Sequence, residues 1–150
     1  MKRIKLFVLA TLVLVSSLGV TYGIIFYQVG NKPMFSYWNV AGDDPGDPII
    51  LHKNRDKEMY IAADAPFDIT EFHVEATVVF SGIQLTYPLP DECYYIIYNE
   101  LPILMGDEIQ CRLYLSTPPY PASGDGMLVL TFYGQNNSVI ASGATKFTIL

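Results

Sequence analysis

The chain has 150 residues and a formal net charge of −6 at pH 7, and this charge is unevenly distributed. All of the acidic residues lie beyond residue 30, whereas Lys2, Arg3 and Lys5 lie before it. An acidic region of this kind repels phosphate backbones, which argues against nucleic acid as a partner. The roughly 120 residues after the N-terminal run are enough for one domain with its own core.

The first element is an apolar segment, residues 6–29, without a charged side chain. About 20 apolar residues in a helix cross a bilayer, and basic residues stay on the cytoplasmic side. The sequence therefore predicts a single-pass membrane protein with a cytoplasmic N-terminus, an uncleaved anchor and an extracytoplasmic domain. The alternative is a cleaved signal peptide with its apolar core at 6–18 and cleavage after Gly19. The Gly19-x-x-x-Gly23 spacing would let a partner helix approach closely.

We expect three regions: a cytoplasmic tip and anchor at 1–30, a linker or entry loop at 31–48, and an extracytoplasmic domain at 49–150. The middle region is rich in turn-forming residues. This region also contains the aromatic residues Phe35, Tyr37 and Trp38. They either dock on the domain or lie at the membrane interface. The same region contains three carboxylates that could begin a calcium site, those of Asp43, Asp44 and Asp47. The alternative is a solvated turn, which uses the same residue types.

From residue 49 onward, short β-branched and aromatic runs alternate with turn signals. The clearest run is 72–80, in which apolar and polar residues alternate. The other runs are 49–53, 58–62, 84–88, 94–98, 109–115, 127–133 and 139–150. This pattern predicts an all-β domain, an immunoglobulin-like antiparallel β-sandwich of about seven strands preceded by one transmembrane helix.

The sequence offers no convincing catalytic or metal centre. His52 and His73 both precede the cysteines, which is the wrong ligand order for a blue-copper site. No nucleophile-elbow, zinc-protease or phosphate-loop motif is present. We therefore expect no enzymatic activity, no metal and no cofactor.

Cys93 and Cys111 lie in the region predicted to be extracytoplasmic, where oxidation is permitted. An antiparallel pairing centred on Pro102 would place them directly opposite each other, within reach of a disulfide. The alternative is two buried free thiols. The connection 101–105 is so apolar that we expect it to tuck into the sandwich.

Two features suggest surface roles. The second half of the chain is rich in tyrosine, a residue enriched in recognition surfaces, although half of these side chains could simply cover the sandwich. The candidate partner contacts are Tyr94, Tyr95, Tyr98, Tyr114 and Tyr120. Asn136 begins a glycosylation sequon, Asn136-Asn137-Ser138, on an expected hairpin.

The layout of one N-terminal span followed by an immunoglobulin-like sandwich resembles the stator-type accessory proteins of the archaeal flagellum (archaellum). The resemblance covers the whole chain as architecture only, so no functional residue is carried over. A sandwich that is tethered to a membrane and has no catalytic residues presents a surface at a fixed height. We therefore expect a non-enzymatic, membrane-anchored binding or structural module of the cell envelope, with a protein partner there. The alternative is an accessory subunit of an integral membrane complex whose span packs on partner helices. The partner's identity and the oligomeric state stay open.

Overall fold

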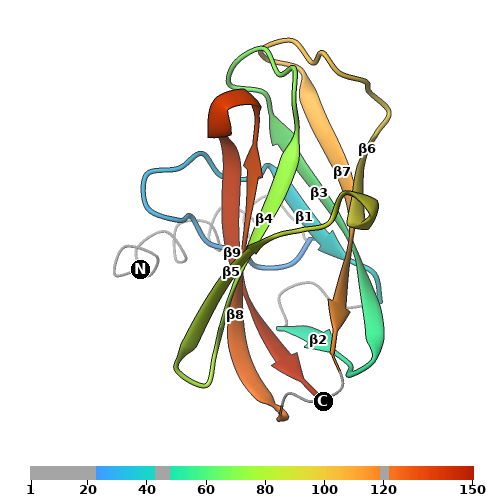
Figure 1. The fold of residues 1–150 in the computed structure, drawn as a ribbon, viewed down its shortest axis with the longest axis vertical. Coiled ribbons are helices and arrows are strands. Elements are labelled where there is room, and N and C mark those ends of the chain that lie inside the picture. Colours follow the sequence, from blue (N-terminus) through green and yellow to red (C-terminus); the bar gives the residue numbers. More distant parts are fainter. Residues whose placement is uncertain (1–22, 43–47, 119–121) are drawn as a thin grey trace.

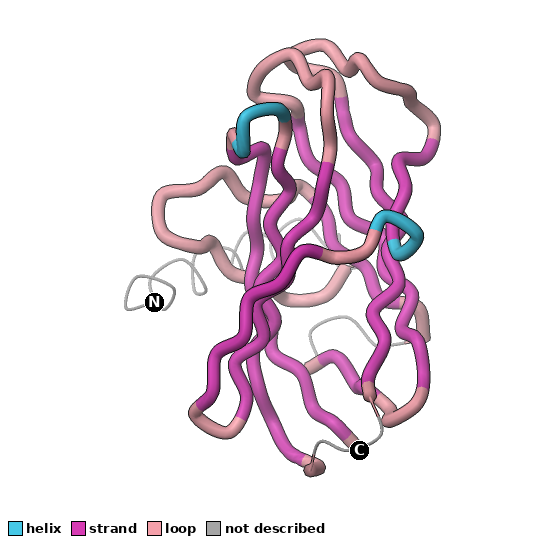
Figure 2. Tube along the Cα trace, in the orientation of Figure 1, coloured by secondary structure: helices cyan, strands magenta, loops and turns pink. Residues whose placement is uncertain are grey.

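The computed structural model describes residues 23–42, 48–118 and 122–150, which form two β-sheets packed face to face (Figures 1 and 2). The four-stranded sheet has the order β1-β3-β7-β6, and the five-stranded sheet has the order β2-β9-β8-β4-β5. The strands are β1 (Tyr37–Val40), β2 (Ile49–Leu51), β3 (Arg55–Asp64), β4 (His73–Phe80), β5 (Ile83–Pro88), β6 (Tyr94–Ile97), β7 (Glu108–Thr117), β8 (Gly124–Tyr133) and β9 (Val139–Ile149). Two short 3-10 helices are η1 (Asp91–Cys93) and η2 (Gln135–Asn137).

The predicted all-β, two-sheet sandwich is confirmed. Eight of the nine strands among the described residues overlap runs that the sequence predicts, and β1 is the one that it misses. The pairing is antiparallel except between β2 and β9, where it is parallel. The strands alternate as expected: in β7, Ile109, Cys111 and Leu113 are buried, whereas the residues between them face outward.

The core fills the space between the two sheets. Its largest fully buried side chains include Trp38, Phe132 and Phe147. Phe35 links the layers, because its ring centroid lies 4.7 Å from that of Phe132 and 5.6 Å from that of Trp38. Aromatic pairs at these separations add to the stabilisation that burial itself provides.

The segment after residue 22 belongs to this sandwich. The Ile24 N–H donates to the carbonyl oxygen of Trp38 in β1 at 2.8 Å, and Tyr27 and Ala144 of β9 exchange backbone hydrogen bonds of 2.7 and 2.9 Å. Residues 23–36 therefore contact β1 and the part of β9 that does not pair with β2, and they close one side of the sandwich. A Cβ at Gly23 would lie 2.6 Å from the Trp38 carbonyl oxygen, so this glycine permits a close backbone approach.

These contacts correct the predicted transmembrane helix over 6–29. Its last seven residues are packed against β1 and β9, and Gly23 packs on a strand rather than on a partner helix. Within the described ranges, no helix is long and apolar enough to cross a membrane. The predictions built on the span are therefore wrong: the single-pass topology, the membrane as integral partner, and the anchored envelope module with its accessory-subunit alternative. Residues 6–22, including Gly19, lie outside the described residues.

The sandwich also includes part of the expected entry loop. Phe35 and Trp38 are buried in the core, whereas Tyr37 faces outward from β1. The aromatic residues of this loop therefore belong to the domain. Of the two predicted alternatives, docking on the domain is the correct one, and a position at the membrane interface is not. The candidate calcium ligands Asp43, Asp44 and Asp47 lie outside the described residues, so the calcium prediction stays untested.

Candidate functional site

The edge strand β5 has an apolar inner face. Ile83 pairs with Phe80 of β4 and Leu85 pairs with Val78, and directly opposed residues of an antiparallel pair share one face of the sheet. Val78 and Phe80 pack against the core, so Ile83 and Leu85 also lie on the side that faces the other sheet. The intervening Gln84 and Thr86 lie on the outer face, where the Thr86 hydroxyl hydrogen-bonds Thr77 at 2.8 Å.

The opposite sheet does not cover this inner face. Ile83 is 70% exposed and Leu85 is 59% exposed, although both occupy core-facing positions. Figure 1 shows the β4–β5 hairpin reaching away from β6, the corresponding edge of the four-stranded sheet. We call Val78, Phe80, Ile83 and Leu85 the uncovered strip.

The two sides of the sandwich are closed differently. Residues 23–36 bind both sheets, at β1 and at the part of β9 that does not pair with β2, whereas a single connection, residues 89–93, crosses from β5 to β6. At this crossing Leu89 is buried and its N–H donates to the Val74 carbonyl oxygen at 2.9 Å. Burial raises the pKa of Tyr87 on β5, and the nearby Cys93 thiol adds to that shift. The uncovered strip lies beyond this crossing, toward the tip of the hairpin.

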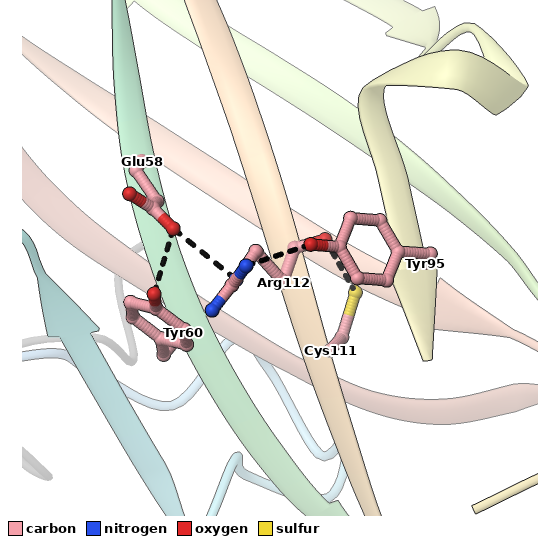
Figure 3. A network of polar contacts seen from close by, with 5 residues as sticks. All are labelled: Glu58, Tyr60, Tyr95, Cys111 and Arg112. Atoms are coloured by element: carbon pink, nitrogen blue, oxygen red, sulfur yellow. Dashed lines mark hydrogen bonds and ion pairs between the residues drawn. The ribbon is translucent and has the colours of Figure 1, made fainter. Parts of the chain in front are cut away.

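A polar cluster lies on the outer face of the four-stranded sheet (Figure 3). The Arg112 guanidinium carbon lies 4.9 Å from the ring centroid of Tyr60 and 5.7 Å from that of Tyr95. Arg112 Nη1 donates to the Tyr95 hydroxyl at 2.8 Å, and Arg112 Nε lies 3.1 Å from Glu58 Oε1. The Tyr60 hydroxyl donates to the same Glu58 oxygen at 2.7 Å, and this bond raises the pKa of Tyr60. We call Glu58, Tyr60, Tyr95 and Arg112 the Arg112 cluster.

Beside this cluster lies an open pocket of about 400 Å³. Its lining comes from all four strands and from the residue after β6. The lining residues are Tyr37, Asn39, Tyr60, Ile61, Ala62, Ile97, Tyr98, Glu108, Gln110 and Cys111.

The structure separates the five tyrosines that the sequence groups as partner contacts. Tyr94 is buried on the inner face of β6, where burial raises its pKa to about 12, so its assignment to the surface is wrong. Tyr95 and Tyr98 are exposed, and Tyr114 is half-buried on the outer face of β7. Tyr120 lies outside the described residues.

The predicted disulfide is not formed, because Cys93 and Cys111 are both free thiols. The register of β6 and β7 places Ile96, not Cys93, opposite Cys111, so the pairing centred on Pro102 is wrong. Cys111 lies in the core, where burial raises the pKa of its thiol to about 12. Of the apolar connection 101–105, Ile103 tucks in and bridges to Ile69, whereas Leu101, Leu104 and Met105 are exposed.

The remaining candidates have ordinary surroundings. His73 stacks on Tyr133 with 5.2 Å between ring centroids, and His52 is exposed. Within the described part of the chain, no three His, Cys, Asp or Glu side chains are grouped so that they could hold a metal ion. Asn136 lies on the exposed turn before β9, and its glycosylation stays a prediction.

Comparison with known proteins places the chain by fold alone. No family model matches the sequence, and no curated protein matches it. The fold is similar to that of a Niemann-Pick type C2 protein from the Japanese carpenter ant, with a TM-score of 0.69 and 14% identity over 85% of this chain and 100% of that one. It is also similar to chicken MD-1 complexed with lipid IVa, with a TM-score of 0.51 and 9% identity over 83% of this chain and 90% of that one. The resemblance to archaellum accessory proteins stays a prediction.

Proposed function

We propose that this protein binds an acyl-chain lipid along the uncovered strip on the inner face of the β4–β5 hairpin. The role is binding without a chemical step. This proposal replaces the membrane-anchored envelope module, which the packing of residues 23–29 contradicts.

The exposure of Ile83 and Leu85 carries the proposal. Fully burying a leucine or isoleucine side chain stabilises a protein by about 1.5–3 kcal/mol, and the strip leaves most of both side chains in water. Their paired neighbours Val78 and Phe80 are also apolar, so the strip offers no hydrogen-bonding side chain to a ligand. A flexible hydrocarbon chain is the ligand that gains most from such a surface.

The fold comparison gives independent support. Chicken MD-1, which shares the two-sheet architecture, was solved with lipid IVa bound. The identity of 9% transfers no residue, so the site in this chain rests on its own uncovered strip.

Titration with a fluorescent fatty acid below its micelle concentration tests the proposal. The full chain should bind the probe saturably. Leu85→Asp should weaken binding about tenfold or more, because it places a charge in an apolar contact.

Thr86→Asp is the matched control, because it adds the same charge to the next residue on the outer face of the same strand. It should leave the affinity unchanged. Any binding of the fatty acid to the apolar residues 6–22 is the same in both variants, because they share this segment. A difference in affinity between the two variants therefore reports on the strip. Equal affinities for the two variants, or no saturable binding by the wild type, would contradict the proposal.

A further inference from the structure

We propose that the outer face of the four-stranded sheet carries a second site, a tyrosine-lined pocket that binds a small organic cation of the quaternary ammonium class. This pocket lies on the opposite side of the sheet from the lipid site, and the two proposals stand independently.

Strand register builds the pocket from two rows of outward-facing residues. One row runs across the strands as Tyr37, Ala62, Gln110 and Ile97. The next runs as Asn39, Tyr60, Arg112 and Tyr95, of which Asn39 and Tyr60 line the pocket. Ala62 is small and buried between larger neighbours, so it forms the floor. The volume of about 400 Å³ lies within the range of pockets that hold small molecules.

Three tyrosines are among the residues that line this pocket, and they are Tyr37, Tyr60 and Tyr98. The face of an aromatic ring attracts a cation, and clusters of such rings recognise quaternary ammonium groups. The Arg112 cluster shows this chemistry on the same face, because a guanidinium already lies against the rings of Tyr60 and Tyr95.

Tyr98 is hard to explain by the fold alone. Its backbone has φ of 63°, in the left-handed region that bulky residues rarely adopt, and its side chain is 89% exposed. Neither backbone preference nor burial accounts for a tyrosine at this position. Contact with a ligand in the pocket accounts for it, since strained residues gather at functional sites.

The charge around the pocket favours a cation. Among the described residues that line the pocket, Glu108 is the one with a charged side chain. Asp64 lies directly opposite it in the neighbouring strand, and like charges in this position repel each other unless a cation lies nearby. Near the pocket, the outward-facing positions of β3 and β7 carry three carboxylates against the single guanidinium of Arg112, and these carboxylates are Glu58, Asp64 and Glu108. Glu58 already pairs with Arg112, so an excess of negative charge remains.

Calorimetric titration of the full chain with choline tests this inference, with 3,3-dimethylbutan-1-ol as its uncharged isostere. Choline should bind saturably, and the isostere should bind at least about tenfold more weakly, because it lacks the attraction to the rings and to Glu108. Glu108→Gln and Tyr98→Gly should each weaken choline binding about three- to tenfold. Tyr98→Gly should not lower the thermal midpoint, since glycine adopts positive φ without strain.

Two variants provide matched controls. Glu71→Gln removes the same charge from an exposed residue away from the pocket, and Asn137→Gly replaces another exposed residue with positive φ. Neither should change choline binding. The inference is overturned if the isostere binds as tightly as choline, if choline does not bind at millimolar concentration, or if the pocket variants behave like the controls. Saturable binding of a neutral sugar without binding of choline would identify the pocket as a glycan site and would also overturn it.

Discussion

Leu85 lies directly opposite Val78 on the inner face of the five-stranded sheet, but only Val78 packs against the core. The two side chains belong to neighbouring strands and point to the same layer, so the difference between them is how far the opposite sheet extends. The position of Leu85 identifies a core-facing surface that the protein itself leaves open.

The N-terminal segment should prove necessary for stability. In Gly23→Ala the new Cβ would lie 2.6 Å from the backbone oxygen of Trp38, which no side-chain rotation can relieve. We expect a loss of about 1–3 kcal/mol in the free energy of unfolding, measured by denaturation with Trp38 fluorescence, because Trp38 is the single tryptophan and is fully buried. Gly134→Ala is the control and should cost less, since its Cβ would meet the ring of Phe67 at 3.0 Å and that ring can shift. Equal stability of Gly23→Ala and wild type would show that this segment is not docked.

The two cysteines should differ in reactivity. With a thiol-reactive chromophore and no reductant, Cys93, which is half-buried, should react in the native protein, whereas the buried Cys111 should not. Denaturant should then expose both thiols of the chain. Cys93→Ala should abolish the native reaction. If the denatured, unreduced protein shows no reactive thiol, the two cysteines are joined in a disulfide, which would contradict this prediction.

Burial of Cys111 should make stability fall at alkaline pH. Its pKa rises from 9.0 to about 12 on folding, so between these values the folded state keeps a proton that the unfolded state has lost. The free energy of unfolding should therefore decrease as pH rises through this window, and Cys111 should contribute about 1.4 kcal/mol per pH unit. Denaturation at several pH values should show a shallower slope for Cys111→Ala than for wild type. An unchanged slope would mean that this thiol ionises in the folded protein.

Lysine should not substitute for arginine in the Arg112 cluster. Lysine keeps the charge but lacks the planar fork that contacts Tyr60, Tyr95 and Glu58 together. We expect Arg112→Lys and Arg112→Met to lower the thermal midpoint by similar, small amounts. If lysine restored the wild-type midpoint, charge alone would explain the cluster.

Most strands could be predicted from the sequence, because the alternation in β4, β7 and β8 is strong and turn signals separate the runs. β1 could not, since its four residues lie among turn formers and its partner β3 is distant along the chain. Residues 23–29 misled the prediction for a different reason. An apolar run has the same composition whether lipid or a protein core surrounds it, and here Ile24 and Tyr27 reach a core.

The candidate sites depended on tertiary relationships. The alternation of Ile83 and Leu85 with Gln84 and Thr86 is visible in the sequence, but the extent of the facing sheet is not. The disulfide prediction failed on register, because β6 ends at Ile97 and Ile96 pairs with Cys111. Tyr94 and Tyr95 differ in the same way: adjacent residues on one strand face opposite sides, and only the register shows which side is the core.

The lipid proposal is tested most directly by nuclear Overhauser effects between a bound fatty acid and methyl-labelled leucines. Leu85 and Leu104 are both 59% exposed, but Leu104 lies in the β6–β7 connection at the other end of the sandwich (Figure 1). Exposure alone would give both residues equal contact with an apolar ligand. The proposal predicts contacts from the acyl chain to Leu85 and none to Leu104. Equal contacts to both leucines, or contacts to Leu104 alone, would contradict it.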